Sequence, residues 1–97
     1  MDRKAGKTMA TQAKKESFTY YAPSAGNVLL AGDFTDWEKH PVSLKKQTDG
    51  SWKAVVPLEP GMHEYRFLVD GQWRDDEHCS ARKPNGLGAL NCVREVR

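Results

Sequence analysis

Tyr65, Phe67 and Val69 alternate with Arg66 and Leu68, and this period of two predicts a β-strand with two different faces. Tyr65, Phe67 and Val69 fall on one face, which we expect to lie in the core. Arg66 falls on the opposite face. The predicted strand therefore presents a long cation on the side that faces away from the core.

The dipeptide Asp70-Gly71 follows this strand directly and predicts a two-residue hairpin turn. The hairpin carries Trp73 onto the returning strand, close enough to share a face with Arg66. A large aromatic side chain and a long cation that are kept together outside the core have the composition of a recognition surface.

Short β-type runs separated by turn residues occur along the rest of the chain. They predict strands at residues 18–21, 27–31, 42–45, 52–58 and 91–96. Residues 32–37 are predicted to form a loop, and residues 74–86 a charged loop. No segment has convincing helical periodicity. About six to eight short strands with frequent turns predict an all-β fold, an antiparallel β-sandwich.

Charge divides the chain into two parts. Residues 1–16 hold five basic and two acidic side chains, which leaves ten basic and eleven acidic side chains for residues 17–97. We expect residues 1–16 to form a flexible basic tail, or alternatively a helix that docks on a partner, and residues 17–97 to form one domain. Because this domain is nearly neutral, its composition argues against binding of nucleic acid.

The sequence also bears on the cellular compartment. No apolar run approaches the length of a transmembrane helix, and no apolar stretch of a secretory signal follows the basic N-terminal residues. A complete chain of this kind is expected in the cytoplasm, without a membrane partner. Cys79 and Cys92 are the two cysteines, and this compartment favours free thiols over a disulfide.

Three motifs in one order carry a family resemblance. They are GDFTDW at residues 32–37, GMHEYRFLVDGQW at residues 61–73 and NGLGALN at residues 85–91. Together they resemble the glycogen-binding domain of the AMP-activated protein kinase β subunit. The same module type, carbohydrate-binding module family 48, occurs at the N-terminus of isoamylases and glycogen branching enzymes. The resemblance covers approximately residues 18–96.

The resemblance implies an immunoglobulin-like β-sandwich that binds an α-1,4-linked glucan such as glycogen or starch. It implies that Trp37 and Trp73 are the two sugar-stacking tryptophans. Arg66 falls where the family often has a lysine that bonds sugar hydroxyls. Leu87 matches a leucine that inserts into the curve of the glucan, and Asn91 matches an asparagine that bonds sugar hydroxyls.

These residue types suit such a ligand. A glucose ring has flat faces lined with C–H groups, against which an indole offers a rigid apolar plate. Two such plates at an angle can follow the curve of an α-1,4 chain. Arginine keeps the charge of lysine but changes the geometry. Ala89 stands where kinase-type members carry a threonine, so one polar contact worth about 0.5–1.5 kcal/mol is expected to be missing.

Other candidate residues have simpler interpretations. Trp52 lies between core-type neighbours and is expected in the core, and Phe34 is expected in the core or as a loop anchor. The charged run Asp75-Asp76-Glu77 is expected to form a solvated surface. His78, Cys79 and Cys92 lack a recognised ligand spacing, so neither a metal site nor another cofactor is expected.

We therefore interpret the chain as a module that binds α-glucans without catalysis. No cleft with paired carboxylates, nucleophile arrangement or phosphate loop is recognisable, so we do not expect an enzyme. Two alternatives remain. The domain is a protein-interaction or scaffold domain that uses the same aromatic patch, or it is the N-terminal module of a branching or debranching enzyme.

Overall fold

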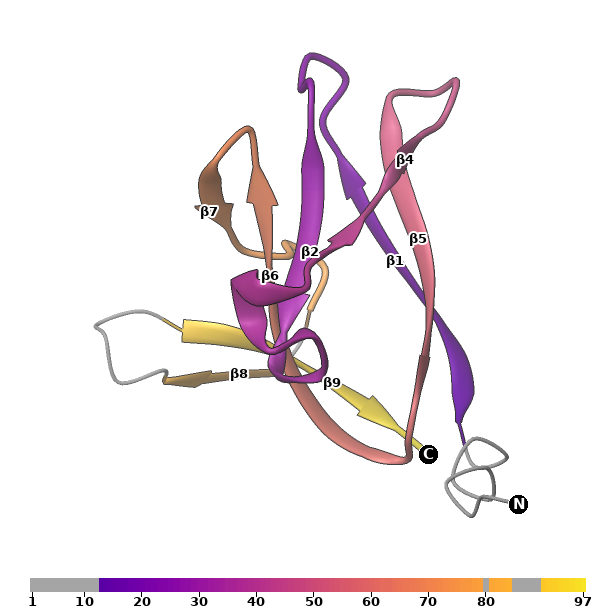
Figure 1. Cartoon of the computed structure of the whole chain (residues 1–97), viewed down its shortest axis with the longest axis vertical. Coiled ribbons are helices and arrows are strands. Elements are labelled where there is room, and N and C mark those ends of the chain that lie inside the picture. The colour runs from indigo at the N-terminus through magenta and orange to yellow at the C-terminus, as the bar shows by residue number, and fades with distance from the viewer. Residues whose placement is uncertain (1–12, 80, 85–89) are drawn as a thin grey trace.

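Two antiparallel sheets face each other in the computed structural model, which describes residues 13–79, 81–84 and 90–97 (Figure 1). The smaller sheet has the strand order β1 (Lys14–Tyr21), β5 (Ser51–Leu58), β4 (Lys45–Lys46). The larger sheet has the order β3 (Val42–Ser43), β2 (Val28–Gly32), β6 (Gly61–Val69), β9 (Leu90–Val96), β8 (Ala81–Pro84), and β7 (Gln72–Arg74) pairs with β6. The predicted all-β sandwich is confirmed.

Aromatic side chains from both sheets fill the space between them. Phe18 on β1 meets Tyr65 on β6 edge to face, with ring centroids 5.0 Å apart, and Tyr20 lies 5.0 Å from Phe67. The other buried members of this core are Val28, Leu30, Leu44, Trp52, Val56, Leu58, Cys92 and Val96. The predicted inward face of β6 is therefore confirmed, and Val69 packs against the core while partly buried.

Trp52 is buried, as predicted, with 8% of its surface exposed. Its indole N–H donates a hydrogen bond to the backbone carbonyl of Ala22 at 2.8 Å. This bond satisfies the one polar atom of a side chain that otherwise contributes apolar surface to the core. Phe34 is partly buried and stacks on Phe18, as expected for a core or loop anchor.

The hairpin between β6 and β7 has the predicted turn. Asp70 and Gly71 have φ angles of 49° and 83°, the two positive values that a type I′ turn requires. Asp70 also accepts a hydrogen bond from the backbone N–H of Gly26 at 3.0 Å. The turn sets the register in which Leu68 lies opposite Trp73.

The sequence pattern gave a wrong prediction for two segments of the chain. The single strand expected at residues 42–45 is two short strands, β3 and β4, which belong to different sheets on either side of buried Leu44. The segment expected to be a charged loop contains β8, whose four residues are all exposed and so show no alternation. The described residues thus form nine strands, compared with the expected six to eight.

The first strand extends towards the N-terminus. β1 begins at Lys14, so Lys14–Glu16 belong to the sheet and not to the tail expected over residues 1–16. Glu16 is an inward residue of this strand and pairs with Arg94 of β9 at 2.9 Å. The remainder of the expected tail lies outside the described residues.

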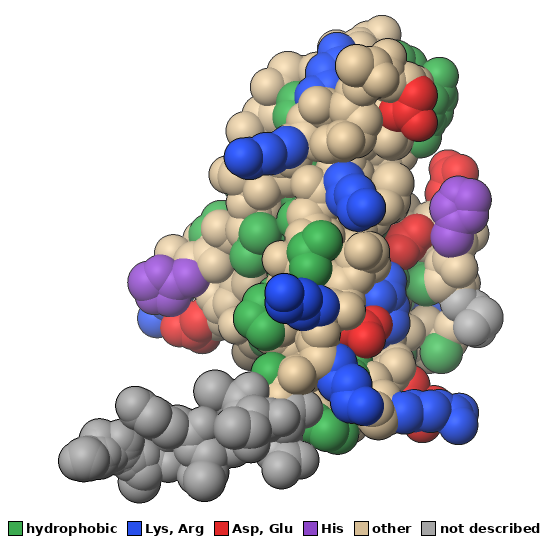
Figure 2. Space-filling model, turned by 90° about the vertical axis from the view of Figure 1, so that its right-hand side faces the viewer, with side chains coloured by type: hydrophobic (Ala, Val, Ile, Leu, Met, Phe, Trp, Pro, Cys, Tyr) green, Lys and Arg blue, Asp and Glu red, His purple; other side chains and the backbone are tan. Residues whose placement is uncertain are grey.

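Basic residues occupy the outer face of the smaller sheet. Figure 2 views the molecule from the side of β4 and β5 and shows Lys and Arg side chains spread among hydrophobic ones. Lys45 lies directly opposite Lys53, and Lys15 projects from the same face. Among the described residues on the outer face of this sheet, Tyr21 is the exposed aromatic side chain. The tryptophan of the hairpin lies on the other sheet.

The connection after β2 is a pair of short 3₁₀ helices, Asp33–Thr35 and Trp37–Lys39, where the sequence predicted a loop. It begins at Gly32, whose backbone passes close to β6. A Cβ atom at this position would lie 2.5 Å from the carbonyl oxygen of Glu64 and 2.7 Å from the ring of Phe34. A glycine is required here because the obstructing oxygen belongs to the backbone of the neighbouring strand.

We expect Gly32→Ala to lower the free energy of unfolding by about 1–3 kcal/mol, because the added methyl group has to push β2 away from β6. Urea unfolding monitored by circular dichroism measures this change. Gly26→Ala is the matched control, since its Cβ would meet only the Asp70 carboxylate at 3.6 Å. Equal stability of the two variants would contradict the close approach at Gly32.

Candidate functional site

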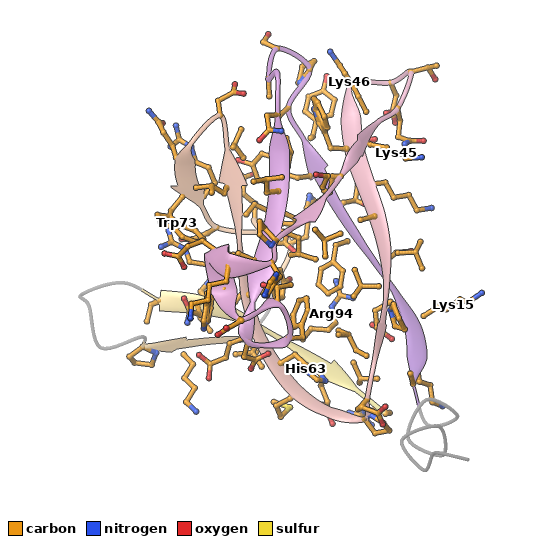
Figure 3. All side chains as sticks on the ribbon, viewed as in Figure 1. Lys15, Lys45, Lys46, His63, Trp73 and Arg94 are labelled. Carbon is orange, nitrogen blue, oxygen red and sulfur yellow. The ribbon has the colours of Figure 1, made fainter. Side chains whose placement is uncertain are left out.

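An aromatic ring and a cation lie together on the outer face of the larger sheet. Arg66 is the diagonal neighbour of Trp73 across the hairpin, and its guanidinium carbon lies 5.7 Å from the centre of the indole ring. Trp73 is 38% exposed. Figure 3 shows Trp73 on the opposite side of the molecule from Lys15, Lys45 and Lys46. The predicted shared face of Arg66 and Trp73 is confirmed.

Asn91 lies further along the same sheet, on β9. Its residue surface is 4% exposed, and its amide Nδ2 donates to the Glu64 carboxylate at 3.1 Å. The second oxygen of Glu64 lies 3.5 Å from the ammonium group of Lys83 on β8. Asn91 is therefore held within a polar cluster on β6, β8 and β9.

Trp37 occupies the loop between β2 and β3 and is half-buried. Asp36 and Trp37 both have a φ of 55°, the left-handed region that side chains other than glycine rarely adopt. Such a conformation costs on the order of 1 kcal/mol or more, so the surrounding contacts have to hold it.

The buried hydroxyl of Thr35 provides those contacts. It accepts the backbone N–H of Gly32 at 2.9 Å and lies 3.0 Å and 2.7 Å from the carbonyl oxygens of Gly32 and Trp37. Its single proton donates to one of these two oxygens at a time. The hydroxyl thereby joins the start of the loop to the residue that carries the indole.

A carboxylate that the sequence assigned to solvated surface belongs to the site. Asp75 accepts a hydrogen bond from Nε of Arg66 at 3.1 Å, and its other oxygen lies 3.5 Å from Nη1 of Arg82. An ion pair with one partner nearly half exposed contributes only about 0–1 kcal/mol to stability. The main consequence of this contact is therefore that it sets the position of the Arg66 side chain.

The next carboxylate, Asp76, is buried with 6% of its surface exposed, so the expectation of a solvated run is wrong at this residue. Its Oδ2 accepts the hydroxyl of Tyr65 at 2.6 Å, and its Oδ1 accepts the backbone N–H of His78 at 3.0 Å. Burial is the main cause that raises the pKa of Tyr65, and the hydrogen bond to Asp76 raises it further. Burial also raises the pKa of the Cys92 thiol.

Other candidate chemistry is limited. Cys79 and Cys92 are free thiols, as the sequence predicted. Within residues 13–79, 81–84 and 90–97, no group of three or more His, Cys, Asp or Glu side chains is arranged to hold a metal ion. The same described residues include no helix that is long and apolar enough to span a membrane.

The structure brings together some predicted site residues and adds others. Arg66 and Trp73 are in contact, whereas Leu87, and with it Ala89, lies outside the described residues. Glu64 was missed, although the alternation along β6 places it on the same face as Arg66, two residues away. Asp75 was missed as well, although the register of the hairpin pairs Phe67 with Arg74 and one step further places Asp75 opposite Arg66.

This geometry defines a class of protein, a β-sandwich with an exposed indole, a fixed cation and a polar cluster on one sheet. The family model described as the glycogen recognition site of AMP-activated protein kinase matches residues 16–97. The chain belongs to this family.

The relatives agree with this assignment. Subunit beta-1 of the 5'-AMP-activated protein kinase of Homo sapiens is 39% identical over 72% of this chain and 24% of its own length. The beta-1 subunit of Sus scrofa is 34% identical over 72% of this chain and 54% of that sequence. The chloroplastic protein PTST homolog 2 of Arabidopsis thaliana is 42% identical over 55% of this chain and 10% of its own. The matches thus span about half or less of these relatives.

We expect Thr35→Val to destabilise the domain by about 1–3 kcal/mol, because the buried N–H of Gly32 loses its acceptor. Thr35→Ser keeps the hydroxyl and loses one methyl group, so it should cost about 0.8 kcal/mol. Urea unfolding measures both changes. A serine variant as unstable as the valine variant would show that packing, and not the hydroxyl, holds the loop.

Stability should fall as the pH rises above about 9–10. Tyr65 and Cys92 have raised pKa values in the folded state, so the unfolded chain loses these protons first and is favoured at high pH. The free energy of unfolding at pH 8 and at pH 10.5 measures the slope. Tyr65→Phe should reduce this slope whatever its effect at pH 8, and an unchanged slope would contradict the assignment to Tyr65.

Proposed function

We propose that this domain binds α-1,4-linked glucans, such as glycogen, starch or maltooligosaccharides, without catalysis. The observation that carries the proposal is the contact between Arg66 and the exposed indole of Trp73 on the outer face of a domain of the glycogen-recognition family. Trp37, Leu87 and Asn91 complete the proposed set of binding residues.

The chemistry of the pair suits a neutral sugar. The exposed indole of Trp73 offers a flat apolar plate to the C–H face of a glucose ring. The guanidinium of Arg66 beside it supplies N–H donors for sugar hydroxyls in a fixed fork geometry. A ligand with flat apolar faces and polar edges is the kind of molecule that uses both groups at once.

The remaining three residues have different support. Trp37 is held by the loop that Thr35 organises, and its half-buried indole is proposed as the second stacking plate. Asn91 is bonded to Glu64, so we propose that it acts in the binding surface together with that carboxylate. The role of Leu87 rests on the motif alone.

The proposal concerns the domain and not a larger protein. Because the matches span about half or less of the relatives' length, kinase-subunit, scaffold or enzyme-module roles depend on chain outside the matched segment. A cytoplasmic location stays a prediction, and the name of one relative specifies the chloroplast.

We expect Trp73→Ala to abolish or strongly reduce retardation in native gels that contain glycogen, with a loss of affinity of about tenfold or more, equivalent to about 1.4 kcal/mol. The physical reason is the loss of the apolar plate. Tyr21→Ala is the matched control, because Tyr21 is an exposed aromatic residue on the other sheet.

Circular dichroism checks that both variants are folded, and gels without glycogen provide the reference mobility. Retardation of wild type and Tyr21→Ala but not of Trp73→Ala supports the site. If glycogen retards none of the three, the domain does not bind this glucan and a protein partner becomes the better explanation for the exposed patch.

A further inference from the structure

We infer that Asp75 is a positioning residue, which holds the guanidinium of Arg66 in the orientation that binds the ligand. The inference rests on the proposed function, because it concerns the same surface. It assigns a role to a carboxylate that neither the sequence motifs nor the family resemblance had connected with binding.

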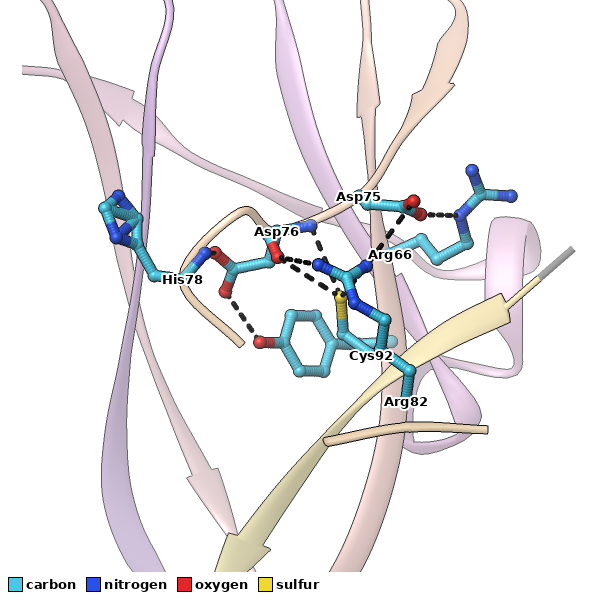
Figure 4. Close-up of polar contacts among 7 residues, drawn as sticks. Arg66, Asp75, Asp76, His78, Arg82 and Cys92 are labelled. Carbon is cyan, nitrogen blue, oxygen red and sulfur yellow. Dashed lines mark hydrogen bonds and ion pairs between the residues drawn. The ribbon is translucent and has the colours of Figure 1, made fainter. Parts of the chain in front are cut away.

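The contact leaves the outer part of the guanidinium available. Asp75 accepts the N–H of Nε at 3.1 Å, which is one of the five donors of an arginine side chain. The two terminal nitrogens of Arg66 point away from Asp75 (Figure 4). Within the described residues, neither terminal nitrogen is bonded to another acceptor. These nitrogens carry the donors that a hydroxyl-rich ligand requires.

Two contacts restrict the side chain from different directions. Asp75 bonds to Nε in the plane of the guanidinium, and the ring of Trp73 lies 5.7 Å from its central carbon. The side chain of Arg66 is 17% exposed. A long side chain ordered before the ligand arrives loses less conformational freedom on binding, which strengthens affinity.

Asp75 is itself held in place. Its second oxygen lies 3.5 Å from Nη1 of Arg82, and Nη2 of Arg82 donates to the backbone carbonyl of Asp76 at 3.2 Å. Asp76 is anchored in turn by the hydroxyl of Tyr65. The contacts in Figure 4 thus connect the core to the donor groups of Arg66. A carboxylate fixed in this way can orient a neighbouring side chain.

A double-mutant cycle tests the inference. Binding of maltoheptaose is measured by calorimetry for the wild type, Asp75→Asn, Arg66→Gln and the double variant. We expect about fivefold weaker binding for Asp75→Asn and about tenfold for Arg66→Gln, which is the range of a single ordinary hydrogen bond. The double variant should bind like Arg66→Gln alone, because Asp75 has no further effect once its partner is gone.

Three variants serve as controls. Glu77→Gln removes the same charge from an exposed position two residues away and should bind like the wild type. Asp75→Glu keeps the carboxylate and should recover part of the affinity. Arg82→Gln leaves the bond to Arg66 in place and should cause a smaller loss than Asp75→Asn.

NMR spectra recorded without ligand test the hydrogen bond between Arg66 and Asp75 independently of binding. The signal to follow is that of the Nε–H group of Arg66. It should be protected from solvent exchange in the wild type and less protected in Asp75→Asn, whose neutral amide oxygen is a weaker acceptor than the carboxylate. Binding losses of Asp75→Asn and Arg66→Gln that add in the double variant would overturn the inference while leaving the proposed function intact.

Two further outcomes are informative. If the wild type binds no glucan, the proposed function fails and the inference falls with it, even when the Nε–H signal shows the pair. If neither Asp75→Asn nor Asp75→Glu folds, Asp75 is a structural residue and the positioning role is wrong.

Discussion

The hydrogen bond between Tyr65 and Asp76 joins the aromatic core to the loop that carries part of the site. Both residues are buried, and a buried carboxylate without partners would cost several kcal/mol. Asp76 therefore has one position that satisfies both of its oxygens, one on the Tyr65 hydroxyl and one on the N–H of His78. This constraint fixes the chain between β7 and β8, and it places Asp75 beside Arg66.

Strand β6 serves both the core and the surface. Its inward residues, Tyr65 and Phe67, contact the aromatic rings of β1, while its outward residues carry the polar groups of the site. Each of the outward charges, Glu64 and Arg66, has an opposite charge from another segment within 3.5 Å. Pairing limits the net electrostatic field of this face, so the binding that we propose for it depends on directed hydrogen-bond donors and on the apolar indole of Trp73.

The hairpin shows why part of the structure was predictable. An Asp-Gly pair adopts positive φ angles readily, and the alternation on β6 is a local property, so turn, register and inward face follow from a few neighbouring residues. Strand β8 had no such signal, because all four of its residues are exposed at the edge of the sheet. The left-handed conformation of Trp37 was equally hidden, since it is accompanied by a contact between the Thr35 hydroxyl and the Trp37 carbonyl that the sequence pattern does not reveal.

The sequence by itself determined the all-β class, the central hairpin, the face shared by Arg66 and Trp73, and the family motifs. The tertiary structure decided which polar groups meet. Arg66 and Asp75 lie one step beyond the Phe67–Arg74 pair of the hairpin, whereas Glu64 and Asn91 are 27 positions apart and meet through the pairing of β6 with β9. Alternation and turn chemistry act over a few residues, whereas contacts at such separations depend on the order in which strands pair. The burial of Asp76 was also decided by the tertiary structure, because this carboxylate bonds to the hydroxyl of the core residue Tyr65.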